Sequence, residues 1–177
     1  NAGKVTIFFI DEKQIIRPED IGTLDEIVRV AELNKAKIHK INLTAQFRCS
    51  GAEGYVNWID DVLQLQATGN YDGWDKEDYE FKIFDDPNEL RKAINEKNAM
   101  GFNSRILAGY AWDWTAQKKG NANAQVADVL IPVFNFGMPW NSRNIGTTWA
   151  IDEEGIDQIG CVHTSQGLEF DYVGVIV

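Results

Sequence analysis

The amino-acid sequence predicts an α/β fold built on a doubly wound, mainly parallel sheet. Short apolar runs rich in β-branched and aromatic residues alternate along the chain with stretches of helical periodicity. Strands that are separated by helices are typical of parallel sheets. The chain has 177 residues, of which 44% are hydrophobic, and this is enough to bury the core of one domain. We therefore expect a single domain over residues 1–177.

The first half of the chain contains two predicted strands and two predicted helices. Residues 5–10 form a continuous apolar run, as in a strand that is buried on both faces. A helix is expected over 18–33, because acidic residues follow its initial proline and suit the helix dipole. Residues 41–47 predict a second strand. Apolar residues at helical spacing predict a helix over 52–66, and a glycine-flanked turn follows at 69–73.

The second half contains the remaining predicted strands. Residues 79–84 predict a third strand, and Asp86-Pro87 are typical of a helix start, here of a helix that ends near residue 98. A fourth strand is expected over 106–111, and residues 112–149 are less regular, with a long loop at GNANAQ and extended pieces around VLIPVF and TTWAI. The last predicted elements are a strand at 159–162, a turn or helical start at 164–168 and a strand at 172–177.

Charge and cysteine content exclude several classes of protein. The formal net charge of -10 argues against a nucleic-acid binder that acts alone, because phosphate neutralisation needs clustered Lys and Arg. Cys49 and Cys161 form no CxxC pair, so the sequence predicts neither a disulfide framework nor a zinc site. It has no apolar run of about 18 residues and no signal-peptide pattern. We expect a cytoplasmic protein with no membrane partner.

The polar residues DEKQ at 11–14 have two open interpretations. An acid pair after an apolar strand resembles a Walker B element, but no GxxxxGK[ST] loop occurs anywhere in the chain. The isolated chain is therefore expected not to hydrolyse ATP. One alternative is a later element of a nucleotide hydrolase, in which the amide of Gln14 senses the γ-phosphate. The other is a polar strand end beside solvent.

Arg48 and the tryptophans also have both a functional and a structural interpretation. Arg48 follows a predicted strand, at the sheet edge where α/β proteins place ligands, and its planar guanidinium can bind phosphate oxygens; it can equally be a surface arginine paired with an acid. Aromatic side chains can stack on unpaired bases, whereas core packing is the usual role of a tryptophan. Trp140 is the best stacking candidate in a set that also contains Trp112, Trp114 and Trp149.

The stretch HTSQGLEFDYVGVIV at the end of the chain carries the most specific pattern. It resembles motif V of superfamily I helicases, roughly T-x-H-x-x-[KQ]-G-x-E-F before an apolar strand. DEKQ then resembles motif III, with Ile10 where that motif usually has Gly, and QFRC resembles the arginine-bearing motif IV. Together with RILAGYAWDW and MPWN, these stretches resemble a helicase-like family related to the Schlafen helicase region. That resemblance covers nearly the whole chain.

The resemblance implies a role for each matching residue. Gln14 would sense the γ-phosphate and Arg48 would act as an arginine finger; these are the two implied catalytic residues. Glu169 would accept a hydrogen bond from the ribose, Gly167 would allow close backbone approach, and Gln166 stands where relatives carry Lys or Gln. The residues implied to lie toward nucleic acid are His163, Thr164 and Trp140. His163 can also be simply a polar residue at a strand end.

The resemblance also implies a fold and a function. It implies the second RecA-like domain of an ATP-dependent DNA or RNA helicase or translocase, cut from a longer parent that carries Walker A and B. ATP and Mg would be held mainly by the N-terminal RecA-like domain of that parent, and the other partner would be single-stranded DNA or RNA. Two alternatives remain open, namely an ATP-driven switch that does not unwind and a non-enzymatic module that binds a protein.

Overall fold

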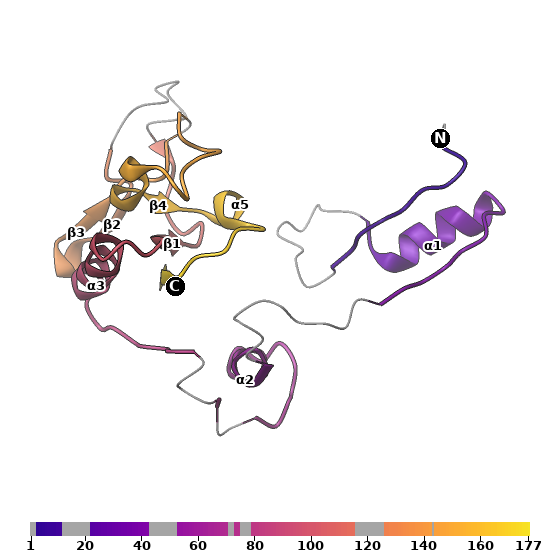
Figure 1. Cartoon of the computed structure of the whole chain (residues 1–177), viewed down its shortest axis with the longest axis horizontal. Helices are drawn as coiled ribbons and strands as arrows, with labels where there is room; N and C mark the ends of the chain where they lie inside the picture. The colour runs from indigo at the N-terminus through magenta and orange to yellow at the C-terminus, as the bar shows by residue number, and fades with distance from the viewer. Residues whose placement is uncertain are drawn as a thin grey trace. The chain divides into compact units, whose positions relative to one another are not determined.

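The computed structural model describes residues 3–11, 22–42, 53–70, 73–74, 79–115, 126–142 and 144–177. Its elements are shown in Figure 1. The chain divides into an N-terminal unit, Asn1–Tyr79, and a C-terminal unit, Glu80–Val177.

A three-stranded parallel sheet forms the centre of the C-terminal unit (Figure 1). β1 (Ser104–Ala108) lies between β4 (Ile159–Gly160) and β5 (Tyr172–Ile176) and pairs in parallel with both. An isolated parallel bridge between Trp140 and Ile159 adds the segment at Trp140 to the sheet, beside β4. The predicted α/β class with a parallel sheet is therefore confirmed for this part of the chain.

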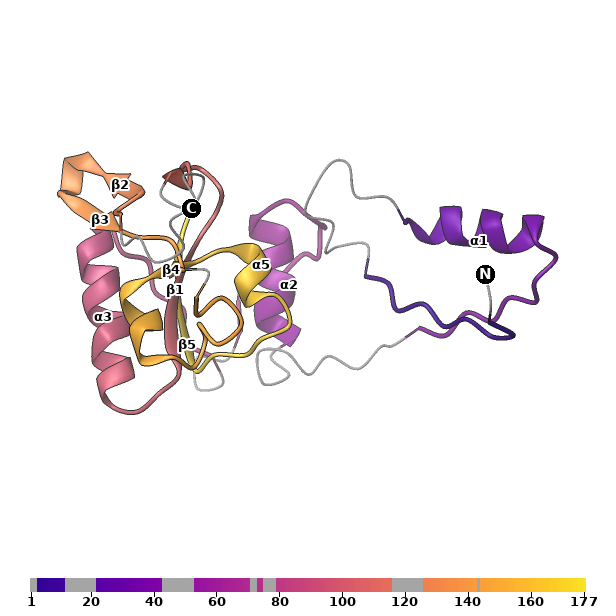
Figure 2. The ribbon, with the colours of Figure 1, turned by 90° about the horizontal axis from the view of Figure 1, so that it is seen from above.

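Helix α3 (Pro87–Ala99) covers one face of this sheet (Figure 2). The helix begins as its sequence predicts, because the Asp86 carboxylate accepts a hydrogen bond from the Asn88 backbone N–H and proline occupies the first turn. Its packing brings Ile94 and Leu90 close to a glycine in β5. A Cβ at Gly174 would lie 3.0 Å from Ile94 Cγ1 and 3.1 Å from Leu90 Cδ1. The helix therefore packs directly on the β5 backbone.

The opposite face of β1 is covered by the segment around Trp149. The Arg105 side chain points to this face and is only 3% exposed. Its guanidinium donates to the backbone oxygens of Trp149 at 3.1 Å and of Asp152 at 2.8 Å. Burial lowers the pKa of Arg105, and the charge of Asp152 opposes that effect. The fully buried Trp149 ring lies against Gly160 of β4, where no Cβ would fit.

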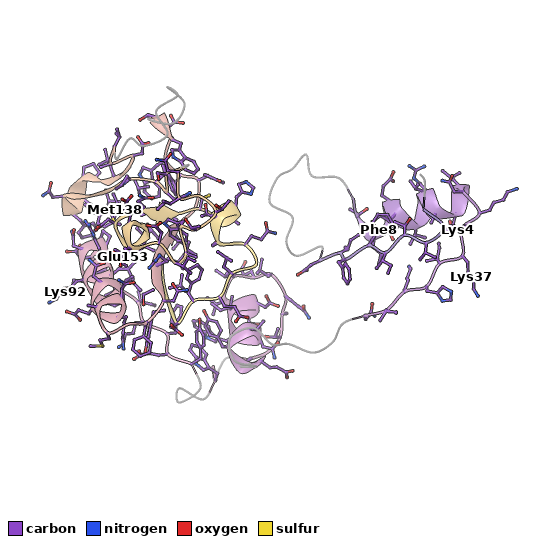
Figure 3. The ribbon with its side chains drawn as sticks, turned by 45° about the horizontal axis from the view of Figure 1, so that its top comes forward. Lys4, Phe8, Lys37, Lys92, Met138 and Glu153 are labelled. Atoms are coloured by element: carbon purple, nitrogen blue, oxygen red, sulfur yellow. The ribbon has the colours of Figure 1, made fainter. Side chains whose placement is uncertain are left out.

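A short antiparallel hairpin adds to the core of this unit. β2 (Val129–Ile131) pairs with β3 (Phe136–Met138), and the connection contains the 3-10 helix η3 (Pro132–Phe134) and Asn135 in the left-handed region. Met138, labelled in Figure 3, is fully buried. The chain continues from β3 into Trp140. A second 3-10 helix, η4 (Glu153–Asp157), leads to β4, and the four-residue helix α5 (Val162–Ser165) follows β4.

The N-terminal unit contains helices α1 (Leu24–Leu33) and α2 (Glu53–Val62). The Thr23 hydroxyl caps α1 by accepting from the Glu26 backbone N–H, so this helix begins later than the predicted residue 18. No residue of α1 is buried. The α2 region has an aromatic cluster, because the Tyr55 ring stacks on Tyr79 at 4.1 Å and meets Trp74 edge-on at 4.9 Å.

The predicted strands at 5–10 and 79–84 are wrong. Neither segment forms a strand, and Phe9 is 86% exposed and Ile83 is 82% exposed. The physical reason is that an apolar run becomes a strand only when a neighbouring strand satisfies its backbone. Phe8, labelled in Figure 3, is likewise 62% exposed. Residues 41–42 are not in a strand either, while 43–47 and the loop at 120–125 lie outside the described residues.

The helix bounds and the C-terminal elements agree more closely with prediction. The helix predicted over 52–66 ends earlier, at Val62, and the strand predicted over 106–111 is shifted toward the N-terminus and ends at Ala108. The strands predicted at 159–162 and 172–177 are confirmed as β4 and β5. Within the described ranges, no helix has both the length and the apolar character that a membrane span requires.

Candidate functional site

The turn that follows β4 contains most of the predicted site residues. Helix α5 begins directly after Cys161, and the Ser165 and Gln166 backbone N–H groups donate to the Cys161 and Val162 carbonyls at 3.1 and 3.0 Å. Gly167 follows with a φ of +81°, in the left-handed region that favours glycine. The local backbone therefore favours a glycine at this position, directly after the helical turn.

Thr164 holds this turn against the segment beside β4. Its hydroxyl donates to Asn141 Oδ1 at 3.0 Å and lies 3.1 Å from Cys161 Sγ. The Asn141 backbone N–H in turn donates to the Ile159 carbonyl at 2.8 Å. A hydroxyl has one proton, so with that proton on Asn141 the Cys161 thiol is the donor to Thr164. The Thr164 hydroxyl thus holds the turn in position through contacts inside the unit. The prediction that Thr164 lies toward nucleic acid did not include these contacts.

Trp140 does not offer a free ring for stacking. It is 2% exposed and belongs to the apolar core of the C-terminal unit. Its ring packs against Trp114 at 5.5 Å and Tyr110 at 6.0 Å between centroids. Core packing, the structural interpretation, therefore describes Trp140 as well as the fully buried Trp149.

An exposed aromatic pair lies beside the turn instead. Tyr110 is 51% exposed, and its ring centroid is 5.8 Å from that of His163, which is also exposed. Tyr110 comes two residues after β1 ends, and His163 comes three residues after β4 ends. Because the two strands are parallel and adjacent, both side chains lie at the carboxyl edge of the sheet, where α/β proteins commonly bind ligands.

Glu169 lies at the other end of β1. Its backbone carbonyl accepts from Asn103 Nδ2 at 3.4 Å, and Asn103 precedes β1. Two residues further on, the Asp171 carboxylate accepts from the Asn103 backbone N–H at 2.7 Å. The chain therefore crosses from the carboxyl edge at His163 to the amino edge at Glu169, so the structure does not bring these two predicted site residues together. Gln166 and Glu169 are both exposed.

The predicted catalytic residues Gln14 and Arg48 lie outside the described residues. Their roles stay predictions. Across the ranges that the structure describes, no three His, Cys, Asp or Glu side chains form a group that could hold a metal ion.

Sequence reasoning missed Tyr110 and Asn141. The strand predicted over 106–111 included Tyr110 as a strand residue, whereas β1 ends at Ala108. Gly109, directly before Tyr110, was the available signal, because glycine often marks the end of an element. No local pattern signalled Asn141, because its bond to Thr164 joins residues that are 23 positions apart.

Comparison with known proteins gives the family. The model of the family described as "Schlafen group 3, DNA/RNA helicase domain" matches residues 1–177. The uncharacterized protein YPL245W of Saccharomyces cerevisiae is 26% identical over 196 residues, which cover 98% of this chain and 41% of that protein. No solved structure matches the chain. Because the family model spans the whole sequence, the chain belongs to the Schlafen group 3 DNA/RNA helicase domain family.

Proposed function

We propose that this chain is the second motor domain of an ATP-dependent helicase or translocase that acts on single-stranded DNA or RNA. The observation that carries the proposal is the turn at 161–171, which joins two strands of a parallel sheet and whose sequence resembles a helicase motif V, with Cys161 where that pattern has Thr. Membership of a family described by a helicase domain supports it. The chain covers 41% of its yeast relative, so the activity proposed here is that of a longer parent.

The ATP site would be shared with the N-terminal RecA-like domain of the parent. That domain would hold ATP and Mg, which supply the phosphoryl group and its charge neutralisation. From this chain, Arg48 would stabilise charge on the transferring phosphoryl group, and Gln14 would sense the γ-phosphate. Glu169 would accept a hydrogen bond from the ribose. Its carboxylate fits that role, since it is exposed and has no hydrogen-bond or ion-pair partner among the described residues.

The test is the ATPase rate of the full-length parent with and without single-stranded nucleic acid. We expect stimulation by the strand in the wild type and a loss of about 10³-fold or more in Arg48→Ala, as for an arginine finger. Arg29→Ala is the matched control, because Arg29 is an exposed arginine paired with Glu26 on α1. Wild-type rates in Arg48→Ala would contradict the arginine-finger role and favour a non-enzymatic, protein-binding role for this segment of the parent.

A strand-displacement assay on a tailed duplex then separates a helicase from a switch. Displacement that requires ATP supports unwinding by the parent. Robust strand-stimulated ATPase activity without displacement would instead indicate translocation or an ATP-driven switch that uses the same fold.

A further inference from the structure

Tyr110 belongs to a series of neighbouring aromatic rings that ends at the turn after β4. The rings follow one another from Trp114 to Trp140, then to Tyr110 and His163, with centroid distances of 5.5, 6.0 and 5.8 Å. Trp140, in the middle, is 2% exposed, while Tyr110 is 51% exposed. The middle of the series is therefore fixed in the core, and the end formed by Tyr110 and His163 faces solvent.

The backbone around Tyr110 also restricts where its ring can go. Gly109 follows β1, and the Ala111 backbone N–H donates to the Gly109 carbonyl at 2.8 Å, which forms a tight turn at Tyr110. His163, whose ring centroid lies 5.8 Å from that of Tyr110, belongs to α5, and the turn of α5 is held by the bond between Thr164 and Asn141. An aromatic ring that is held in place loses little conformational entropy when a ligand stacks on it.

We propose that the exposed ring of Tyr110, beside the imidazole of His163, stacks on a base of single-stranded nucleic acid. This inference rests on the proposed function and names the side chain that would contact the base. Every base has a π-face, so such a contact tolerates any sequence. It also suits an acidic chain. With a net charge of -10, stacking is a source of affinity that does not depend on phosphate neutralisation.

The experiment measures binding of fluorescent oligothymidylate and oligouridylate by the full-length parent, using anisotropy. We expect Tyr110→Ala to weaken binding about 10-fold, and Tyr110→Phe to bind within about 2-fold of wild type, because base–aromatic stacking needs the ring and not the hydroxyl. Phe134→Ala is the matched control, since Phe134 is a partly exposed aromatic residue on the β2–β3 connection. Phe134→Ala should leave both strand binding and basal ATPase activity unchanged.

Two further measurements distinguish stacking from other roles. The slope of log Kd against log salt should be the same in wild type and Tyr110→Ala, because no phosphate contact is lost. On a strand of abasic deoxyribose units, the two proteins should bind equally. An equal weakening of both strands by Tyr110→Ala would indicate a structural role and overturn the stacking proposal.

The outcomes also separate this inference from the proposed function. Strand binding and stimulated ATPase activity that survive Tyr110→Ala unchanged would overturn the stacking role alone. A wild-type parent that binds neither oligonucleotide would overturn both proposals. If Tyr110→Ala does not fold, the wild type still decides, because equal affinity for the normal and the abasic strand contradicts any base stacking.

Discussion

Single residues decide how closely the segments of the C-terminal unit approach one another. Gly160 of β4 is such a residue, because a Cβ there would lie 2.4 Å from Cη2 of the fully buried Trp149. Gly155 is similar, with a Cβ position 2.1 Å from the Trp149 carbonyl oxygen. These two glycines and Arg105, which donates to the same carbonyl, fix the path of the segment over the sheet.

Replacement of Gly160 by alanine should therefore destabilise the chain. We expect the Gly160→Ala substitution to lower the free energy of unfolding by about 1–3 kcal/mol, because the methyl group overpacks a filled site. Gly109→Ala is the control, since nothing lies within 4 Å of its Cβ position. Urea unfolding followed by tryptophan fluorescence measures both. An unchanged midpoint for Gly160→Ala would mean that Trp149 does not occupy this position.

The site residues could be predicted from sequence only in part. Gly167 was assigned to the turn from its pattern, and its left-handed φ gives the local reason for a glycine there. The motif resemblance predicts the same location for His163 and Thr164, but their side chains lie differently, since Thr164 bonds inward to Asn141 and His163 contacts Tyr110. Such differences depend on contacts between residues far apart in sequence, which a local pattern does not contain.

At the scale of elements, the sequence predicts best the helices and strands whose ends are marked by capping or turn residues. Helix α3 begins where Asp86 and Pro87 predict it, and β5 follows a glycine-containing turn. The strands predicted at 5–10 and 79–84 are wrong because an apolar run has the sequence pattern of a buried strand whether or not a partner strand exists. Strand formation is decided by pairing. β1 has two partners, whereas these runs have none among the described residues.

The connection between α5 and the segment beside β4 depends on one hydroxyl. Thr164→Val removes that hydroxyl at nearly constant shape, so Asn141 Oδ1 loses a donor at a buried position. We expect the free energy of unfolding to fall by about 1–2 kcal/mol, and Thr164→Ser to remain close to wild type. Thr147→Val, at an exposed threonine, is the control. Chemical denaturation of the four proteins tests this; a Thr164→Val protein as stable as the control would refute the bridging role.

At the scale of the whole molecule, burial is unevenly distributed between the two units. Among the described residues, every buried apolar side chain belongs to the C-terminal unit, from Ile94 to Ile176. In the N-terminal unit, Asp60 is the one buried residue that the structure describes. Local stability follows burial and tertiary hydrogen bonding, so the two units should differ in how readily their backbones open.

Amide hydrogen exchange of the chain should reveal this difference directly. We expect the slowest exchange in β1, because it is hydrogen-bonded on both sides and covered by α3 and by the segment at Trp149. The amides of α1 should exchange many-fold faster, because a ten-residue helix with no buried residue is only marginally stable. The two halves of the chain thus serve as each other's reference in one experiment. Protection of α1 equal to that of β1 would mean that α1 packs against a surface in solution, and the N-terminal unit would then share the stability of the sheet.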